Sequence, residues 1–185
     1  MGISCQQQNE KDTFNVRSYK NHADVRGGTM YMKNTKERNE MELLFDSRSS
    51  NEGFARVTVA AFMTQLNPTV EEVSDVKTAV SEAVTNAIIH GYENEIHTIR
   101  IHCITEGNRI GIQIEDHGRG IENVSQAMEP LFTTKPELDR SGMGFAFMEA
   151  FMDKLEVTSK PGEGTTVYME KYIGKGRETW STQSL

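Results

Sequence analysis

The longest helix-period run in the chain, residues 69–91, restricts the possible folds more than any other feature. Thr69 followed by Glu72 forms a capping-box pattern at its start, and Gly91 is a typical helix stop at its end. Between these limits apolar residues recur at helical spacing: Val73, Val76, Val80, Ala83, Val84, Ala87 and Ile88. We therefore expect one long helix whose apolar face packs against a second layer.

Alternating apolar and polar residues predict that the second layer is a sheet. Residues 41–45 alternate as a half-buried strand does. Residues 99–103 and 110–114 alternate on either side of a Glu-Gly-Asn turn and predict a hairpin. Two more strands, 155–159 and 165–171, are joined by a Pro-Gly-Glu-Gly turn. We expect a mixed, mostly antiparallel sheet.

Two further helices complete the predicted order of elements. Ser49 and Glu52 repeat the capping-box pattern before a helix that ends near Asn67-Pro68. The apolar residues at helical spacing in this helix are Phe54, Val57, Ala61 and Phe62. A short helix at 145–152 precedes the last two strands. The order β-α-α-β-β-loop-α-β-β, without repeats, predicts an α+β two-layer α/β sandwich with the helices on one face of the sheet.

Composition divides the chain into one domain and two ends. The 185 residues fit a single domain with extensions. Residues 1–36 are rich in Asn, Gln and Lys and lack a sustained period, so we expect a disordered or non-native extension there, with Met30 and Met32 as alternative starts. We expect the domain at 37–173 and a flexible polar tail at 174–185.

Charge and hydropathy disfavour several classes of function. The net charge of −7 argues against broad binding to DNA or RNA, which needs a basic face, and favours a protein partner. No apolar run approaches the roughly 20 residues that a membrane span needs. Cys5 and Cys103 form neither a disulfide framework nor a zinc motif. We therefore expect a cytoplasmic protein without membrane or direct nucleic-acid contact.

A polar stripe interrupts the apolar pattern of the long helix. Glu82, Asn86 and His90 follow one another at intervals of four residues, on one face. An ordinary solvated face is the simpler interpretation of such a stripe. However, Asn86 offers a neutral oxygen suited to a Mg²⁺ ion that already holds phosphates and waters. Glu82, one turn earlier, could orient a hydroxyl or accept its proton.

The sequence Asp116-His117-Gly118-Arg119-Gly120 follows directly on the predicted strand 110–114. A carboxylate fixed at a strand end can accept a hydrogen bond from an exocyclic amine, and two glycines let a flat base approach the backbone. Asp and Gly are also ordinary turn residues, so this motif alone is weak evidence for a base-binding loop.

The sequence Ser141-Gly142-Met143-Gly144 opens the third helix and offers backbone N–H groups where phosphates could lie. Its spacing matches neither a P-loop nor a GxGxxG motif. The preceding segment predicts a lid over a polyphosphate. Its hydroxyl and cationic residues are Thr133, Thr134, Lys135 and Arg140. An ordinary surface loop is the alternative for this segment.

In order and setting, these motifs resemble the N box and the three glycine boxes of the GHKL superfamily, which includes gyrase, Hsp90, histidine kinases and MutL. The corresponding segments are Ser81–Asn86 with His90-Gly91, Asp116–Gly120, Gly142–Gly144 and Gly164-Thr165-Thr166. The resemblance covers residues 40–171 and implies the GHKL, or Bergerat, ATP-binding fold, with ATP and Mg²⁺ as cofactors.

Within that superfamily the chain resembles the anti-sigma factor kinases of Gram-positive bacteria, and specifically the sporulation family of anti-sigma factor F. The similar runs are NEGFARVTVAAF, SEAVTNAIIHGY, EPLFTTKPELDRSGMGF and EGTTVY. The resemblance implies a homodimeric protein serine/threonine kinase that binds and inhibits sigma-F when it carries ATP. It also implies phosphorylation of a serine on a small anti-anti-sigma factor. The first strand is a candidate dimer interface, because its edge must be paired or protected.

The resemblance also implies roles for individual residues. Glu82 would be the catalytic base and Asn86 the Mg²⁺ ligand. Asp116 would contact adenine with help from Thr166. The remaining nucleotide-binding positions would be Gly118, Gly120, Thr133, Thr134, Lys135, Arg140, Ser141, Gly142, Met143 and Gly144. Glu52 and Arg56 would contact the partner protein, although an exposed Arg on a helix more often serves solubility alone.

Other functions fit the same motifs. The chain could be a general-stress anti-sigma kinase of the same fold, which only partner identity would separate from a sporulation factor. It could also be a non-catalytic module that sequesters a partner in an ATP-dependent way, and a test of Glu82 separates this case. A sensor histidine kinase is less well supported, because His22 lies in an irregular segment without heptads. A topoisomerase or chaperone would need a further domain that contributes a lysine.

Overall fold

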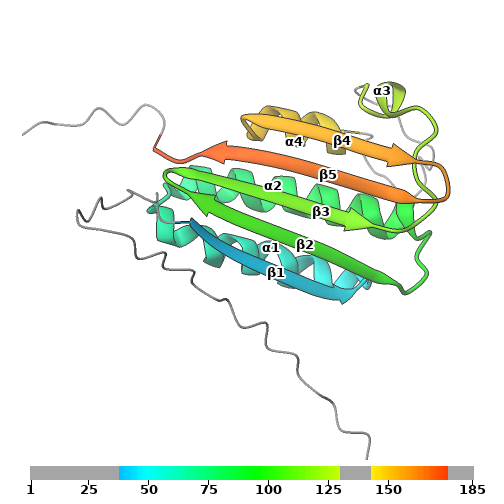
Figure 1. The fold of residues 1–185 in the computed structure, drawn as a ribbon, viewed down its shortest axis with the longest axis horizontal. Helices are drawn as coiled ribbons and strands as arrows, with labels where there is room; N and C mark the ends of the chain where they lie inside the picture. Colours follow the sequence, from blue (N-terminus) through cyan, green and yellow to red (C-terminus); the bar gives the residue numbers. More distant parts are fainter. Residues whose placement is uncertain (1–37, 130–142, 175–185) are drawn as a thin grey trace, which may run out of the picture. The chain divides into compact units, whose positions relative to one another are not determined.

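The computed structural model describes residues 38–129 and 143–174. One five-stranded sheet with the strand order β1-β2-β3-β5-β4 forms its framework (Figure 1). The strands are β1 (Arg38–Asp46), β2 (Thr98–Glu106), β3 (Arg109–Asp116), β4 (Lys154–Lys160) and β5 (Gly164–Tyr172). All neighbouring pairs run antiparallel, so this sheet is fully antiparallel rather than mixed.

Three helices cover one face of this sheet, and Figure 1 shows them together behind the strands. They are α1 (Ser49–Met63), α2 (Val70–Asn86) and α4 (Gly144–Phe151), with α2 between the other two. Short turns η1 (Thr64–Leu66) and η2 (Ala87–Gly91) follow α1 and α2, and a one-turn helix, α3 (Val124–Ala127), was not predicted. The α+β two-layer sandwich and its element order are confirmed. None of the helices in the described ranges has the length and apolar character needed to cross a membrane.

The core lies between the apolar face of the sheet and the three helices, and α2 is its central helix. In β2, Ile99, Ile101 and Cys103 are completely buried, whereas the residues between them are partly exposed. The facing residues of α2 are spaced at one helical turn and are also completely buried: Val76, Val80 and Val84. Burial of each such side chain stabilises the fold by about 1.5–3 kcal/mol. This packing holds α2 firmly against the strands.

The start of α2 matches its prediction, whereas the start of α1 does not. Thr69 Oγ1 accepts the Glu72 N–H at 3.1 Å, and Glu72 Oε2 accepts the Thr69 N–H at 2.6 Å, which completes a capping box. The capping box predicted for Ser49 and Glu52 is wrong, since α1 begins at Ser49 itself without a side-chain cap. The Glu52 carboxylate instead pairs with an arginine one turn later.

The residues that face the core from α1 also differ from those that define its period in the sequence. Phe54 and Val57 are more than half exposed, at 54% and 56%. Ala55, Val59 and Met63 are buried instead. The helix therefore carries two apolar stripes, and the stripe that includes the small Ala55 side chain lets α1 approach α2 closely.

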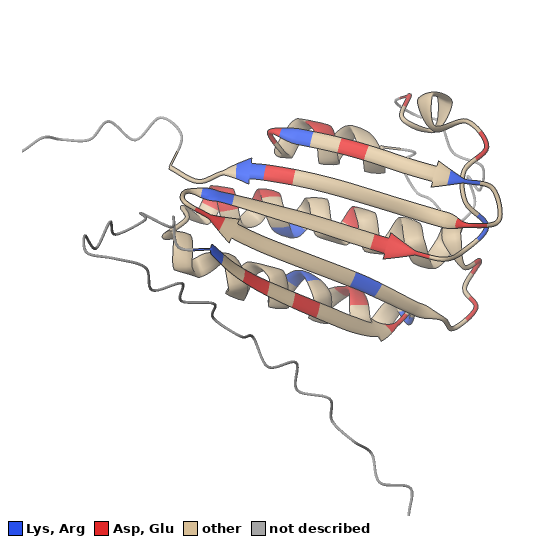
Figure 2. Cartoon of the chain, viewed as in Figure 1, with Lys and Arg blue, Asp and Glu red and all other residues tan. Residues whose placement is uncertain are grey.

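The opposite face of the sheet is polar, as the charges along the strands show in Figure 2. Arg100 of β2 pairs with Glu42 of β1 and, at 2.8 Å, with Glu115 of β3. Arg109 of β3 pairs with Glu170 of β5 at 2.6 Å. This face is therefore joined by cross-strand ion pairs rather than covered by a second apolar layer within the described residues.

Candidate functional site

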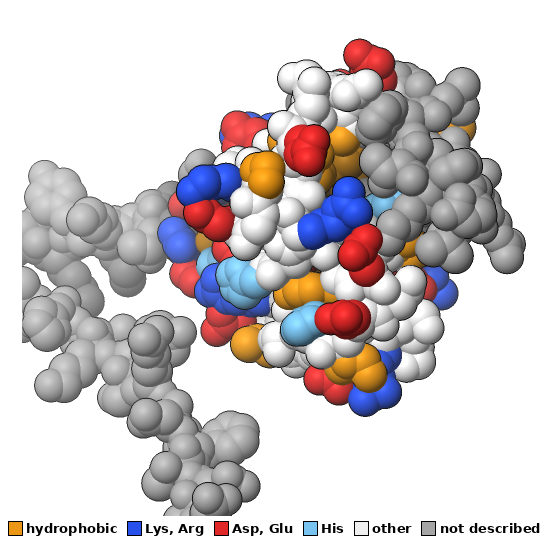
Figure 3. All heavy atoms as spheres, turned by 90° about the vertical axis from the view of Figure 1, so that its right-hand side faces the viewer, with side chains coloured by type: hydrophobic (Ala, Val, Ile, Leu, Met, Phe, Trp, Pro, Cys, Tyr) orange, Lys and Arg blue, Asp and Glu red, His pale blue; other side chains and the backbone are white. Residues whose placement is uncertain are grey.

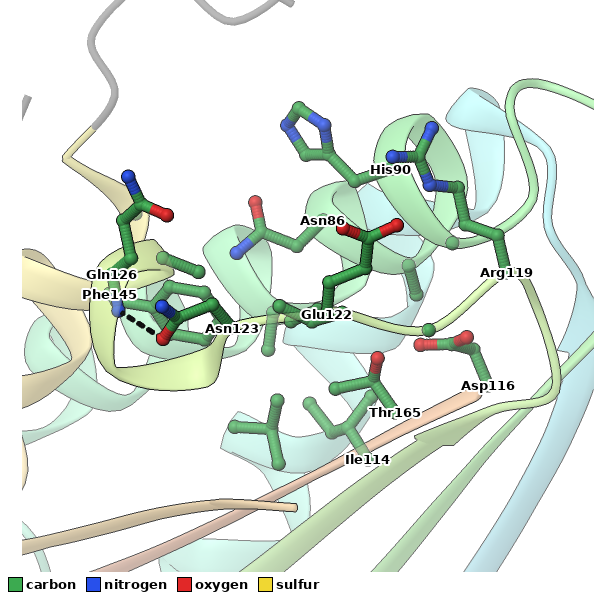
Figure 4. A pocket seen from close by; sticks show the side chains of 18 residues that line it. Asn86, His90, Ile114, Asp116, Arg119, Glu122, Asn123, Gln126, Phe145 and Thr165 are labelled. Carbon is green, nitrogen blue, oxygen red and sulfur yellow. Dashed lines mark hydrogen bonds between the residues drawn. The ribbon is translucent and has the colours of Figure 1, made fainter. Parts of the chain in front are cut away.

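A pocket opens at the end of the sheet where β3 finishes (Figure 4). Its walls come from α2 and η2, the loop after β3, α3, the start of α4 and the first residues of β5. Four residues of the predicted site line it: Asn86, Asp116, Gly120 and Gly144. Figure 3 views this end of the molecule, where acidic, basic and histidine side chains are mixed over the surface. Residues far apart in the sequence thus meet at one site.

At one end of the pocket, two side chains of α2 meet the first residue of α4. A Cβ atom built on Gly144 would lie 3.1 Å from Glu82 Oε2 and 3.2 Å from Asn86 Nδ2. The carboxylate and the amide therefore both contact the N-terminus of α4, where backbone N–H groups lack partners within the helix. A larger residue at 144 would separate α4 from these two side chains.

At the other end, Asp116 is the last residue of β3 and is only 7% exposed. Its Oδ1 accepts the Gly118 N–H at 2.9 Å. Burial raises the pKa of the Asp116 carboxyl, and hydrogen bonds from the backbone N–H groups of Gly118 and Thr165 offset part of this rise. A buried carboxylate held by the backbone in this way is suited to accept a hydrogen bond from an amino group in the pocket.

The hydroxyl side chain beside Asp116 belongs to Thr165, not to Thr166. The strand register pairs Asp116 with Thr165, and Glu115 with Thr166. Successive side chains of a strand point to opposite faces. Thr165 therefore lines the pocket, while Thr166 lies on the open face of the sheet. The threonine beside Asp116 is therefore Thr165 and not the predicted Thr166.

Two glycines in the loop after β3 are required by close backbone contacts. A Cβ atom on Gly118 would lie 2.1 Å from the Gly91 carbonyl oxygen, and one on Gly120 would lie 2.1 Å from the Lys160 carbonyl oxygen. Gly120 also has a φ of +71°, in the left-handed region that favours glycine. The loop is thus held between η2 and the β4–β5 turn. Gly120 lines the pocket, whereas Gly118 packs against the last residue of η2.

The helix that carries Asn86 ends in a wider turn than the sequence predicts. The α-helix stops at Asn86, and η2 is a π-helical turn in which the Tyr92 N–H donates to the Ala87 carbonyl at 2.9 Å. Asn86 and His90 both line the pocket. Two members of the predicted polar stripe therefore face the pocket, and Glu82 lies one turn earlier beside α4.

Several predicted site residues lie outside the residues that the structure describes. They are Thr133, Thr134, Lys135, Arg140, Ser141 and Gly142. Their expected roles as a lid and as phosphate contacts stay predictions. Met143 is described and directly precedes α4, where its carbonyl accepts the Phe147 N–H at 2.9 Å.

The donor groups of the pocket fit a cation that arrives with its ligand better than a metal held by protein alone. Among residues 38–129 and 143–174, no group of three or more His, Cys, Asp or Glu side chains could hold a metal ion. Asn86 supplies one neutral amide at the pocket wall (Figure 4). Mg²⁺ commonly binds few protein oxygens together with substrate phosphates and waters, and the Asn86 amide can supply one such oxygen.

Sequence comparisons find similar proteins over most of the described domain. Residues 46–171 match the family described as "Histidine kinase-like ATPase domain". An anti-sigma F factor of Thermoanaerobacter sp. is 60% identical over 139 residues, which cover 75% of this chain and 97% of that protein. The chain belongs to the anti-sigma F factor family. An anti-sigma F factor of Anoxybacillus flavithermus is 59% identical over 141 residues, covering 76% of this chain and 97% of that protein.

One solved structure aligns with part of this anti-sigma F family member. The blue-light activated histidine kinase of Erythrobacter litoralis EL346 aligns with a TM-score of 0.48 and 19% sequence identity. The alignment covers 68% of this chain and 42% of that chain. The family membership rests on the sequence matches.

In this family member, the predicted partner-contact residues form a pair on α1. Arg56 Nη1 lies 3.0 Å from Glu52 Oε1, and the two side chains are 41% and 20% exposed. The same nitrogen lies 3.4 Å from the hydroxyl oxygen of Ser81, the residue of α2 that directly precedes Glu82. The pair therefore joins the outer surface of α1 to the part of α2 that carries Glu82.

The pocket also includes residues that the sequence motifs did not assign to it. α3 contributes Gln126 and Ala127. The signal that could have revealed α3 is Asn123, whose Oδ1 accepts the Gln126 N–H at 3.1 Å as a helix N-cap does. Arg119 also lines the pocket, and its guanidinium pairs with Glu93 at 3.0 Å. The α3 residues form a part of the wall that motif spacing alone does not identify.

Proposed function

We propose that this chain binds and inhibits the sporulation sigma factor sigma-F and, as an ATP-dependent protein kinase, phosphorylates a serine of a small anti-anti-sigma factor. The observation that carries the proposal is the convergence of Glu82, Asn86 and the N-terminus of α4 at one end of the pocket. A base, a metal-binding amide and a helix N-terminus are groups that phosphoryl transfer uses. The ATPase family and the names of the relatives support ATP and sigma-F as the ligand and partner.

The adenine base of ATP would lie at the Asp116 end of the pocket. The buried carboxylate can accept a hydrogen bond from the 6-amino group of adenine, which guanine lacks. Thr165 lies opposite Asp116 in the strand register, and its hydroxyl oxygen, 3.0 Å from Ser159 Oγ, can accept a further hydrogen bond. Ile114 and Val167 line the same pocket with apolar side chains, which can cover the flat base.

The phosphates of ATP would lie toward Asn86 and the start of α4. Backbone N–H groups and the positive end of a helix attract anions there. Mg²⁺ bound together with ATP would neutralise phosphate charge, and Asn86 would supply a protein oxygen to it. Lys135 and Arg140, with neighbouring residues outside the described ranges, are proposed to face the phosphates as a lid.

Glu82 is proposed to act as the catalytic base. During transfer, the serine hydroxyl oxygen of the partner bonds to the γ-phosphorus, the bond from that phosphorus to the β,γ-bridging oxygen breaks, and ADP leaves. The Glu82 carboxylate accepts the hydroxyl proton. The short approach between Glu82 Oε2 and a Cβ built on Gly144, 3.1 Å, supports a role at the phosphate end.

Two surfaces are proposed for protein partners. Glu52 and Arg56 on α1 would contact sigma-F or the anti-anti-sigma factor. β1 is an edge strand of the sheet, and its outer edge is proposed to form part of a homodimer interface. Sedimentation equilibrium at micromolar concentration checks the second surface: a dimer supports it, and a monomer argues against it.

Transfer of labelled phosphate tests the kinase proposal. The purified chain is incubated with γ-labelled Mg·ATP and a panel of small candidate partners, and any labelled residue is mapped. We expect label on a serine of one partner, and a fall in its rate of about 100-fold or more with Glu82→Gln. Glu156→Gln changes an exposed carboxylate on the open face of the sheet and is the matched control, which should transfer at the normal rate.

The possible outcomes separate the competing functions. Unchanged transfer by Glu82→Gln would show that the assigned base is wrong. ATP-dependent capture of a partner without label on any protein would favour a sequestering module. Label on a general-stress anti-anti-sigma factor alone would favour the general-stress function.

A further inference from the structure

Tyr92, which follows η2, is a buried polar residue that the proposed chemistry does not use. It is 6% exposed, and its ring packs against His97 with ring centroids 4.8 Å apart. Its hydroxyl donates to the Thr98 carbonyl at 2.6 Å and accepts the His117 N–H at 2.8 Å. One phenol therefore connects the end of η2, the start of β2 and the residue directly after Asp116.

A second contact joins η2 to the same loop. The Gly91 carbonyl accepts the Arg119 N–H at 2.9 Å. A Cβ atom built on Gly91 would lie 2.8 Å from Asp116 Oδ1, so the carboxylate packs directly on this glycine. Gly91 and Tyr92 thus hold the loop at residues 116–119 at two points.

These contacts matter because η2 continues the helix that carries Asn86. Asn86 ends α2, and the five residues of η2 follow without a break. Besides the pairing of β3 with β5, a short path through η2 and its contacts at residues 91–92 therefore links Asp116 to Asn86. Asn86 marks the proposed phosphate end and Asp116 the proposed adenine end. This path is thus the local connection between the two parts of the proposed ligand site.

We propose that Tyr92 is a positioning residue for nucleotide recognition: its hydroxyl holds the backbone after Asp116 so that the carboxylate meets the adenine amino group while the phosphates lie at Asn86. This inference rests on the proposed binding of ATP. The hydroxyl, rather than the ring, carries this role, because the hydroxyl oxygen accepts the N–H of the loop that carries Asp116. Burial raises the pKa of Tyr92, so the hydroxyl stays protonated and acts as donor and acceptor at once.

The test is Tyr92→Phe, which keeps the ring and removes the hydroxyl. Titration calorimetry measures the binding of ATP and of ITP, which has a 6-oxo group in place of the amino group, without any partner protein. We expect ATP affinity to fall about tenfold, as for a lost buried hydrogen bond, and ITP affinity to change less than about twofold. In the transfer assay, KM for ATP should rise while kcat stays within about twofold.

Two further variants make this test specific. Tyr168→Phe is the matched control, because the Tyr168 hydroxyl pairs with Glu170 on the open face of the sheet, and its nucleotide affinity should not change. Gly91→Ala disturbs Asp116 through a new Cβ atom instead of a lost hydroxyl, and it should reproduce the weaker preference for ATP over ITP. Thermal unfolding shows which variants are folded. If Tyr92→Phe does not fold, Gly91→Ala tests whether the contacts at residues 91–92 position Asp116 for adenine.

The outcomes distinguish this inference from the proposed function. If Tyr92→Phe binds ATP and ITP like the wild type, or weakens both equally, the positioning role is overturned. The same holds if Gly91→Ala keeps the full preference for ATP. If the unmodified chain does not bind ATP, the proposed function fails instead.

Discussion

The two ends of the pocket are built in different ways. At the end where we propose that adenine binds, Asp116 and its loop are fixed by backbone hydrogen bonds and by close glycine contacts. At the end proposed for the phosphates, Glu82 and Asn86 of one helix meet the first residue of another. The first end is part of the folded framework, whereas the second depends on side chains. Changes that disturb the backbone contacts of the first end should therefore lower stability, and changes to side chains at either end should lower nucleotide binding or activity.

Gly118→Ala should have the largest effect and tests the framework end. The new Cβ atom would lie 2.1 Å from the Gly91 carbonyl oxygen, and the backbone cannot yield without moving the loop. We expect the free energy of unfolding to fall by about 3 kcal/mol in urea denaturation. Gly53→Ala is the matched control, because the nearest atom to its Cβ lies 4.0 Å away. Equal midpoints for Gly118→Ala and the wild type would contradict the framework description.

Asn86→Ala tests the side-chain end. We expect Mg·ATP affinity to fall by about 10- to 100-fold, as when a group that supports a metal site is removed. The free energy of unfolding should change by less than about 1 kcal/mol, because no buried framework contact is lost. Calorimetric titrations with and without Mg²⁺ make the comparison, and without Mg²⁺ the variant should bind ATP like the wild type. Unchanged Mg·ATP affinity would refute the metal assignment.

Asp116→Asn should separate affinity from stability at the framework end. The amide NH₂ group would face the adenine amino group as a donor, so ATP affinity should fall about tenfold. Burial raises the pKa of the Asp116 carboxyl, so the ionised group opposes folding, and the variant should unfold at a higher temperature. A lower unfolding temperature together with unchanged ATP affinity would contradict both expectations.

The same carboxyl predicts a pH dependence of stability. The pKa of Asp116 in the folded chain lies above its value in the unfolded chain. At pH values between these two pKa values, the folded chain therefore binds more protons than the unfolded chain does. The contribution of Asp116 to the free energy of unfolding should therefore increase as pH falls through the folded pKa toward the unfolded one. The Asp116→Asn variant should lack this pH-dependent contribution to the free energy of unfolding. Identical pH profiles of the denaturation midpoint for variant and wild type would contradict it.

Arg56→Ala should have the smallest effect on the fold. Its pair with Glu52 lies one turn away on the surface of α1, and such pairs contribute about 0.3–0.5 kcal/mol. Capture of sigma-F, if Arg56 is a contact, should weaken by about tenfold or more. Lys154→Ala on β4 is the control, because it also removes an exposed ion pair. Equal capture by both variants would remove Arg56 from the interface.

Local patterns in the sequence predicted most of the fold. The capping box of Thr69 and Glu72 depends on residues three positions apart, so it is visible without tertiary structure. Apolar residues recur every two residues in the strands and every three to four residues in the helices. The sequence therefore distinguishes the residues of the two layers. Part of the pocket lining could be predicted, because Asn86, Asp116, Gly120 and Gly144 belong to motifs at the ends of these elements whose order resembles that of a known superfamily.

The features that the sequence did not predict depend on contacts between distant segments. Only the pairing of β5 with β3 decides whether Thr165 or Thr166 faces the pocket, because a shift of one residue reverses the face. The π-helical turn η2 differs from an α-helix by one residue, and its contacts with the loop after β3 are not local. The capping box predicted at Ser49 would need the Glu52 carboxylate. That carboxylate instead pairs with Arg56, one turn later in the helix.

The direction of ATP in the pocket is tested most directly by measuring ATP and ITP affinities, each with and without Mg²⁺, for three proteins: the wild type, Asp116→Asn and Asn86→Ala. We predict that Asp116→Asn lowers the preference for ATP over ITP and leaves the Mg²⁺ dependence intact. Asn86→Ala should lower the Mg²⁺ dependence equally for both nucleotides and leave the preference intact. If Asn86→Ala changes the base preference, or if Asp116→Asn does not, ATP does not lie in the pocket with adenine at Asp116 and phosphates at Asn86.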